Sequence, residues 1–246
     1  DAQTFKAMFT ITWDLTPKSA VYHNWSDANE VMGYEYNSNL ETYICIDWGW
    51  SHPMSCGFYQ YDRSKDHVYK FDEIFGSRIT LDGLYEKILE RPWVKSVKKV
   101  RVELDQNDRE ISVEYDFITN VKDWVCDIAG NQEREQTGRS NCNYFLEKWG
   151  VDFERRKSGI LYGVSVLRSY IESSNGEKRF FVDSDKCPET IAGIKRYRFP
   201  EKDGSITNEN PEKVDDDAVD ETRYFFVNIL DPNLEDEVPD EAVGIF

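Results

Sequence analysis

Two short, wholly apolar runs, each ending in an aspartate, constrain most strongly what this chain can fold into. Residues 43–46 (Tyr-Ile-Cys-Ile) lead into Asp47, and residues 124–126 (Trp-Val-Cys) lead into Asp127. Runs that are apolar at every position are typical of strands buried in the middle of a sheet. A carboxylate buried at the end of such a strand needs a partner or a metal ion. Alternatively, each aspartate turns outward into its loop or caps the segment that follows.

A third acidic group opens a long amphipathic segment near the end of the sequence and consists of Asp215, Asp216, Asp217 and Asp220. Acids at a helix N-terminus suit the helix dipole, which accounts for one or two of the four. The full set is harder to explain, because like charges repel unless a cation lies among them. Asp217 and Asp220 are spaced i,i+3, and Asp216 and Asp220 are spaced i,i+4, so either pair can share one helix face.

Two strand-end carboxylates and a carboxylate group on a late helix together predict a divalent-metal nuclease site. Mg²⁺ and Mn²⁺ prefer hard oxygen ligands, and two such ions can clamp the attacking and leaving oxygens of a phosphodiester. His52 follows Asp47 closely. It either assists at that site or is an ordinary loop residue.

The order of predicted elements indicates the fold class. Strands are expected over 42–49, 54–61 and 67–75 as an antiparallel meander, followed by a helix over 80–89 that Thr80 caps. The later elements are expected to be a hairpin over 98–104 and 110–117 inserted at a sheet edge, a strand over 123–127, a helix over 132–149 interrupted near Gly138, a strand over 151–155, a helix capped by Ser158, a strand over 180–182, a helix over 188–194, an edge strand over 195–199, a charged loop over 200–214 and a helix over 216–229. This order predicts an α/β fold with helices on both faces of a mixed sheet, three antiparallel strands preceding the parallel ones. It matches a ribonuclease-H-like domain.

Three parts are expected along the chain. Residues 1–40 are polar and irregular and are interpreted as a linker or arm. Residues 41–230 form the ribonuclease-H-like domain, and residues 231–246 form an acidic tail that is expected to be flexible. No apolar stretch approaches the roughly 20 residues that span a membrane, and no signal peptide is visible.

The net charge of −17 argues against a protein that binds nucleic acid by electrostatics alone. Much of the acid lies in the C-terminal third, however, and metal-site carboxylates are neutralised by the ions they bind. Candidate contacts to a DNA backbone are Arg155, Arg156, Lys157, Lys195, Arg196, Lys98 and Lys99. The alternative for each group of basic residues is a solvated face. The five cysteines are odd in number and lack CxxC spacing, which favours free thiols over zinc sites or disulfides.

Four stretches resemble, in the same order, motifs of one known family: the C-terminal nuclease domain of the large terminase subunit of tailed double-stranded DNA viruses that infect bacteria. The stretches are ICIDWGWSHPMSCGFYQYD, WVCDIAGNQE, ERRKSGILYGVSVLRSYI with KRFFVDSDKCPETIAGIKRYRFP, and KVDDDAVDETRYFFVNIL. The resemblance covers about residues 42 to 230. Two departures are Ile128, where the family commonly has proline, and the hairpin, which has no obvious equivalent.

The resemblance assigns roles to the acidic residues. Asp47 and Asp127 match the first two metal ligands, Asp216 matches the Asp of the last motif, and Asp220 matches its later Asp. Asp217 stands where a His is often found and is the first choice for the third ligand. The implied catalytic residues are therefore Asp47, Asp127 and Asp217, with Asp216 and Asp220 as further metal ligands.

The family implies a metal-dependent endonuclease that cuts concatemeric viral double-stranded DNA during genome packaging by two-metal-ion hydrolysis, using Mg²⁺ or Mn²⁺. It also implies an N-terminal ATPase domain beyond residues 1–40, a portal and a small terminase subunit as partners, and the cytoplasm of an infected bacterial host as location. The isolated domain is expected to be a monomer.

Two other classes of function remain open from the sequence. One is another ribonuclease-H-like enzyme, such as a resolvase or recombinase, which junction-specific cutting or strand transfer would reveal. The other is a non-enzymatic acidic domain that docks another protein. In that case the aspartates would be solvated and a metal ion would not raise the melting temperature.

Overall fold

The computed structural model describes residues 19–131, 139–202, 205–206 and 210–231. The first part of the expected arm, the start of the helix predicted over 132–149 and nearly all of the acidic tail lie outside these ranges.

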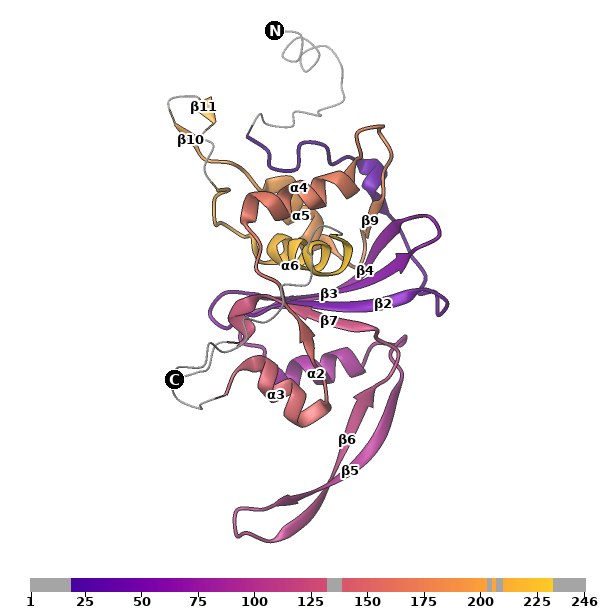
Figure 1. Ribbon diagram of the computed structural model, residues 1–246, viewed down its shortest axis with the longest axis vertical. Helices are drawn as coiled ribbons and strands as arrows, with labels where there is room; N and C mark the ends of the chain where they lie inside the picture. The colour runs from indigo at the N-terminus through magenta and orange to yellow at the C-terminus, as the bar shows by residue number, and fades with distance from the viewer. Residues whose placement is uncertain (1–18, 132–138, 203–204, 207–209, 232–246) are drawn as a thin grey trace, which may run out of the picture.

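A seven-stranded mixed sheet forms the centre of the molecule (Figure 1). Its strands, in the order β1-β9-β4-β3-β2-β7-β8, are β1 (Glu30–Val31), β9 (Phe180–Asp183), β4 (His67–Gly76), β3 (Met54–Asp62), β2 (Glu41–Asp47), β7 (Asp123–Cys126) and β8 (Phe153–Glu154). The neighbours β2, β3 and β4 are antiparallel, whereas β7 is parallel to β2, β8 to β7, β9 to β4 and β1 to β9. The predicted fold class is confirmed.

Helices cover both faces of this sheet. Helices α2 (Leu81–Leu89) and α3 (Asn141–Trp149) lie on one face, and α4 (Ile160–Ile171), α5 (Pro188–Arg196) and α6 (Asp217–Phe225) lie on the other (Figure 1). A π-helical segment, Phe226–Leu230, continues α6, and two 3-10 turns span Asp27–Asn29 and Ile128–Asn131. No helix in the described ranges is both long enough and apolar enough to cross a bilayer.

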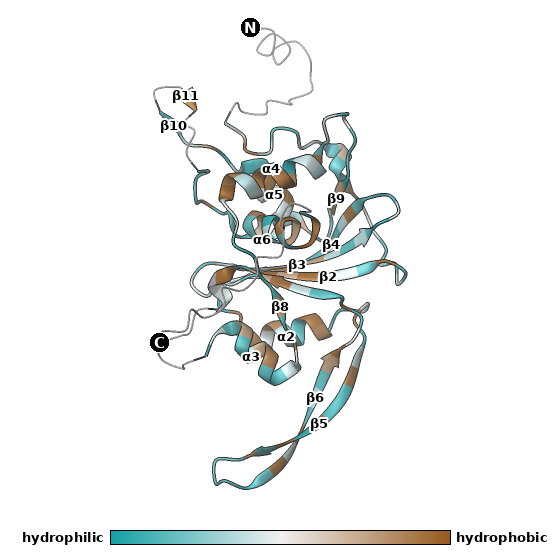
Figure 2. Ribbon diagram, in the orientation of Figure 1, coloured by the Kyte–Doolittle hydropathy of each residue, from teal (hydrophilic) through white to brown (hydrophobic). Residues whose placement is uncertain are grey.

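The two faces of the sheet have separate cores, which explains why the central strands are apolar at every position. Along β2, Tyr43 and Cys45 pack with α4, α5 and α6, whereas Ile44 and Ile46 pack with α2 and α3. Figure 2 shows apolar residues along these strands and on the helix sides that cover them. Because side chains alternate along a strand, Asp47 follows the α6 side of the sheet.

The part of the arm that the structure describes is packed against the domain. Val21 and Tyr22 are buried in the core cluster that includes residues of α4, α5 and α6, and β1 pairs with β9. The amide of Asn29 is fully buried and donates to the carbonyls of Ile171 and Phe180, at 2.9 Å each. The role of residues 1–40 as a link to another domain stays a prediction.

The predicted inserted hairpin is confirmed as β5 (Ser96–Leu104) and β6 (Glu110–Ile118), but its predicted place at an edge of the main sheet was wrong. It forms a two-stranded sheet of its own that projects on the side of α2 and α3 (Figure 1). One of its faces lies against α3, where Arg101 donates to the carbonyl of Glu147 and Lys148 lies over the Tyr115 ring. The ribbon is held by packing on a helix, so its alternating pattern does not indicate an edge strand.

Three local predictions were also wrong. Gly159, not Ser158, is the N-cap residue of α4, and no side chain caps that end. The strand expected over 195–199 is absent from these described residues, because α5 continues to Arg196 and Arg198 forms only a single bridge with Ala20. The expected loop over 200–214 contains a short hairpin of β10 (Glu201–Lys202) and β11 (Ser205–Ile206).

Candidate metal-binding acidic site

Strand pairing brings the first two candidate aspartates to one edge of the sheet. In the parallel pair of β2 and β7, Ile46 lies opposite Cys126, so Asp47 and Asp127 are the next residues along the two strands. Val125 shares the α6-side core with Cys45. Strand alternation therefore directs both aspartates toward the same face.

Helix α6 brings the third acidic group to the same place. It lies across β2, β3 and β7 and begins at Asp217, so its first turn carries Asp217 and Asp220. Asp216 precedes the helix as its N-cap residue, but its side chain makes no capping hydrogen bond. The Asp216 side chain therefore does not cap the helix, so capping does not explain why an acid stands at this position.

The electrostatics of Asp47 show that the acids from all three elements interact. Burial raises the pKa of Asp47 well above its usual value. The negative charge of Asp127 raises this pKa further, followed by the charges of Asp220 and Asp217. Each carboxylate makes ionisation of Asp47 harder, which is the arrangement that a bound cation would relieve.

The two aspartates at the start of α6 are affected in the same direction. Burial raises the pKa of Asp216 and of Asp217, and the charge of Asp220 adds to both shifts. The His52 imidazole lowers the pKa of Asp217 and so lies near the site. The structure therefore places this loop histidine beside the acidic cluster.

Asp127 and Asp220 have protein partners as well. The Asp127 carboxylate accepts a hydrogen bond of 3.0 Å from the amide of Gly130. Asp127 therefore caps the turn that follows it, which was the alternative to metal binding that the sequence left open. Asp220 Oδ1 accepts from Arg223 Nη2 at 3.0 Å and from Nε at 3.2 Å, and the Arg223 side chain is buried. Of the late-helix acids, Asp220 is therefore the one held by a buried cation.

The loops that follow β2 and β7 pack tightly against each other. The Trp48 ring lies edge-to-face with Phe145 and Phe153, with centroids 5.5 Å apart in each case. A Cβ at Gly130 would lie 2.3 Å from Trp48 Nε1, so only glycine fits there. This contact fixes the turn after Asp127 relative to the residue after Asp47.

The carboxylates converge without forming a preassembled metal cage. Within the described ranges, no group of three or more His, Cys, Asp or Glu side chains is arranged to hold a metal ion. The donor chemistry nevertheless fits a hard divalent cation, because carboxylates from β2, β7 and α6 lie within electrostatic range of one another and carry like charge. The residues therefore fit Mg²⁺ or Mn²⁺, which would draw the carboxylates together.

The candidate DNA-backbone contacts lie in different parts of the structure, and several of them are paired with acids. Lys195 pairs with Glu30 at 2.5 Å, and Arg196 pairs with Asp215 at 3.4 Å. On the hairpin, Lys98 pairs with Glu114 at 3.0 Å, and Lys99 lies over the Phe117 ring, 4.7 Å from its centroid. The hairpin projects on the side of the sheet opposite α6 (Figure 1).

Residues Arg155, Arg156 and Lys157 have the most favourable position among the basic candidates. They follow β8, which runs parallel to β7. Parallel strands end at the same edge of a sheet, so this segment leaves the sheet at the edge where Asp127 lies. Arg155 is half-buried and donates to the carbonyl of Phe153, whereas Lys157 is exposed.

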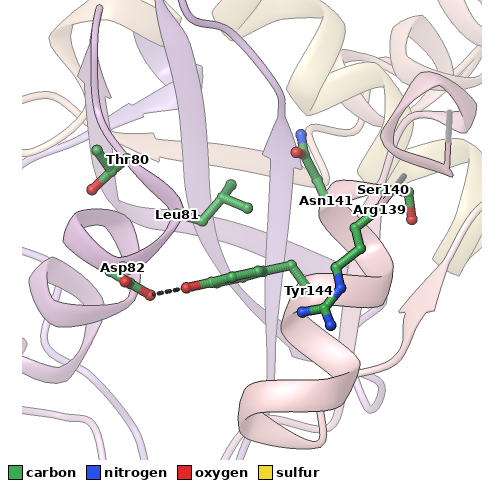
Figure 3. Close-up of a pocket in the computed structure, with 7 residues that line it drawn as sticks. All are labelled: Thr80, Leu81, Asp82, Arg139, Ser140, Asn141 and Tyr144. Carbon is green, nitrogen blue, oxygen red and sulfur yellow. Dashed lines mark hydrogen bonds between the residues drawn. The ribbon is translucent and has the colours of Figure 1, made fainter. Parts of the chain in front are cut away.

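A pocket of about 540 Å³ lies between the first turns of α2 and α3 (Figure 3). It is lined by Thr80, Leu81, Asp82, Arg139, Ser140, Asn141 and Tyr144. Asp82 accepts hydrogen bonds of 2.8 Å from Tyr144 and from Lys148. No residue of the acidic site lines this pocket, so it is a separate feature of the face that α2 and α3 cover.

The sequence reasoning missed a buried charged cluster beneath the acidic site. Lys70 on β4 and Glu221 on α6 are both fully buried and form an ion pair. The available signal was a lysine at a buried position of a strand, because Lys70 shares the face of Val68. Its partner lies 151 residues away, so the sequence could not identify the pair.

Solved structures of large terminases share this architecture. The large terminase from a thermophilic bacteriophage matches with a TM-score of 0.60 and 15% identity, over 93% of this chain and 51% of that chain. The P22 large terminase nuclease domain matches with a TM-score of 0.58 and 16% identity, over 86% of this chain and 92% of that one. The fold is that of a large-terminase nuclease domain. The sequence-based resemblance is therefore confirmed at the level of the fold.

A third match has a metal ion. The nuclease domain of g2p, the large terminase of bacteriophage SPP1, was solved with bound Mn and matches with a TM-score of 0.52 and 15% identity, over 84% of this chain and 97% of that one. This chain spans about half the length of the large terminase from the thermophilic bacteriophage. No protein-family model matches the sequence, and no curated protein matches it either.

Proposed function

We propose that this chain is the nuclease domain of a large terminase and cuts viral double-stranded DNA with the help of divalent metal ions. The observation that carries the proposal is that strand pairing sets Asp47 and Asp127 at neighbouring strand ends, while α6, which begins at Asp217, packs across both strands. The raised pKa of Asp47, caused by burial and then by the charges of Asp127, Asp220 and Asp217, supports it. Three elements that are distant in sequence bring like charges together, and such an arrangement is unfavourable unless a cation joins it. The Mn bound by the SPP1 nuclease domain, which has the same fold, supports this choice of cation.

The acidic residues are proposed to have different roles in metal binding. Asp47 at the end of β2, Asp127 after β7 and Asp217 at the start of α6 would hold the metal ions, with Asp47 as the ligand that both ions would share. Asp216 and Asp220 are further ligands, and the Asp220–Arg223 pair keeps part of that carboxylate occupied. When bound, the ions supply Lewis-acid polarisation of the phosphodiester and neutralise its developing charge.

DNA is proposed to approach the sheet edge where Asp47 and Asp127 lie. Arg155, Arg156 and Lys157 are the favoured phosphate contacts, because they leave the sheet at that edge. Lys195, Arg196, Lys98 and Lys99 are weaker candidates. Two of them are paired with acids on the α6 side of the sheet, and the other two lie on the projecting hairpin.

The remaining partners are proposed from the family resemblance of the sequence, and the longer structures support the ATPase domain among them. The large terminase from the thermophilic bacteriophage, about twice as long as this chain, has been solved in complex with ATP-gamma-S. We infer a corresponding ATPase domain N-terminal to this chain, a portal and a small terminase subunit as partners, and action on concatemeric DNA in the cytoplasm of an infected bacterial host. The separate domain is proposed to be a monomer.

A cleavage assay with supercoiled plasmid and Mn²⁺ tests the proposal. The wild-type chain is expected to nick and linearise the plasmid, and Asp47→Asn is expected to lower the rate by at least about a hundredfold, because it removes the central metal-binding carboxylate. Asp62→Asn is the matched control, because Asp62 ends β3 at a turn, where its carboxylate bonds Ser64. Undiminished cleavage by Asp47→Asn would overturn the proposal.

The same assay separates the other classes of function. Cleavage confined to branched junctions, or transfer of strands between molecules, would indicate a resolvase or recombinase. A chain that neither cuts DNA nor melts at a higher temperature with Mn²⁺ would be an acidic docking domain.

A further inference from the structure

A cluster of fully paired charges lies directly beneath the acidic site. Lys70 Nζ is bonded to Glu221 Oε2 and lies 3.3 Å from Thr222 Oγ1. Tyr59 donates its hydroxyl hydrogen to Glu221 Oε1 at 2.8 Å. Glu73 Oε2 lies 4.0 Å from Lys70 Nζ. These groups join β3, β4 and α6 across the core.

The packing around this cluster shows that space is reserved for it. Gly57 on β3 faces the Glu221 carboxylate, and a Cβ there would lie 2.6 Å from both carboxylate oxygens and 2.7 Å from Lys70 Cε. The strand thus leaves out a side chain where the ion pair lies. Burying charges costs free energy unless hydrogen bonds satisfy them fully, so an apolar contact between the same elements would stabilise the packing of α6 at least as well.

The cluster is connected to the acidic site in two ways, along α6 and through a contact with β2. Glu221 follows Asp220 directly and lies one helical turn after Asp217. The backbone carbonyl of Glu221 accepts a hydrogen bond of 3.1 Å from Cys45 Sγ on β2. Cys45 lies two residues before Asp47 on the same face, roughly 7 Å along the strand.

We propose that the Lys70–Glu221 pair is a positioning element that sets the first turn of α6 against β2, and thereby fixes Asp217 and Asp220 relative to Asp47 for metal binding. The inference rests on the proposed function. Lys70 and Glu221 touch neither metal nor DNA in this account. They act by holding the rotation and depth of α6 through a fully buried ion pair that joins the helix to β4.

The rest of the cluster keeps the pair in place. Glu73 is held by the start of α5, where it accepts hydrogen bonds from the amide of Glu189 at 2.7 Å and from the Thr190 hydroxyl at 2.6 Å. Its charge is therefore balanced by the helix N-terminus, and Lys70 is left to pair with Glu221. Tyr59 also stacks on Phe225, with centroids 4.0 Å apart, so the far end of α6 is fixed by apolar contact instead.

The test replaces the pair by uncharged groups of similar size, in the double variant Lys70→Met with Glu221→Gln. Because one positive and one negative charge are removed, the net charge of the cluster is unchanged while the ion pair between β4 and α6 is lost. The variant also removes the Glu221 charge, which raises the pKa of Asp47, and losing that charge alone would favour the ionised, metal-binding form of Asp47. Weaker Mn²⁺ binding would therefore point to lost positioning. The double variant is expected to melt near the wild-type temperature without metal, yet to bind Mn²⁺ about 10-fold more weakly by titration calorimetry, as is typical when an outer partner of metal ligands is lost. In plasmid cleavage, kcat should fall while KM for DNA stays unchanged.

The matched control is Lys148→Met with Asp82→Asn, which removes an ion pair between α3 and α2 on the other face of the sheet. Its affinity for Mn²⁺ should equal that of the wild type. If the first double variant fails to fold, Tyr59→Phe removes one hydrogen bond from Glu221 and should weaken Mn²⁺ binding in the same direction.

An unchanged Mn²⁺ affinity in a folded double variant, or in Tyr59→Phe, would overturn the positioning role while leaving the proposed function intact. Failure of the wild-type chain to bind Mn²⁺ at all would instead overturn both.

Discussion

The acidic site and the charged cluster beneath it use the same residue types for opposite purposes. In the lower cluster, Glu221 has a lysine, a tyrosine hydroxyl and full burial, so its charge is compensated within the protein. Asp47 has Asp127, Asp220, Asp217 and Glu221 itself as charged neighbours, and each raises its pKa. If Asp47 is the metal ligand that we propose, then hydrogen-bonding and charged partners within the protein, more than burial, distinguish a structural acid such as Glu221 from a ligand.

The largest expected effect is that removing a charge changes the free energy of unfolding in opposite directions in the two regions. Lys70→Met alone leaves the Glu221 charge buried without its partner and should lower the free energy of unfolding by about 3–5 kcal/mol. Asp47→Asn removes a charge that its neighbours oppose, so without metal it should raise the free energy of unfolding. Urea denaturation of both variants without metal measures the two signs. A destabilised Asp47→Asn would show that Asp47 has a compensating partner and would remove the contrast.

A smaller effect is expected in the dependence of stability on pH. The folded state raises the pKa of Asp47, so folding favours its protonated form. The stabilising contribution of that proton is therefore fully present below the ordinary aspartate pKa, about 3.9, and is lost as pH rises through the higher folded value. Asp216 and Asp217 are shifted in the same direction.

Thermal melting from pH 4 to pH 8 without metal should therefore show a smaller decline for Asp47→Asn than for the wild type. Saturating Mn²⁺ should remove most of the difference, because metal binding replaces the proton. Parallel curves for the two proteins would contradict the raised pKa. The difference between the variant and the wild-type curves is the quantity to measure, because other carboxylates also contribute to each curve. Glu41, whose pKa is lowered to about 2, makes the folded state more stable as pH rises, which is opposite to the effect of Asp47.

Much of the fold was readable from the sequence because its signals are local. The apolar runs before Asp47 and Asp127 predicted the central strands, and Thr80 caps α2 as expected, accepting a hydrogen bond from Gly83. The hairpin and the segment 195–199 were misplaced because alternation shows that a strand has two unlike faces and does not show what covers them. Helix α4 begins one residue later than the serine signal indicates, with Gly159 as its N-cap residue.

The acidic site was predictable in part for the same reason. Each of its aspartates follows a recognisable strand or opens a helix, so strand order alone brings Asp47 and Asp127 together. The Asp220–Arg223 pair and the Lys70–Glu221 pair were missed. They depend on the depth and rotation of α6 over the sheet, which no local pattern encodes.

The most direct test of the central claim is a crystal structure of the chain grown with Mn²⁺, with the ion located by its anomalous scattering. The account predicts anomalous peaks between Asp47, Asp127 and Asp217, with the first turn of α6 drawn toward the end of β2. A map at saturating Mn²⁺ with no peak near Asp47, or with peaks only at other acids on the surface, would contradict it.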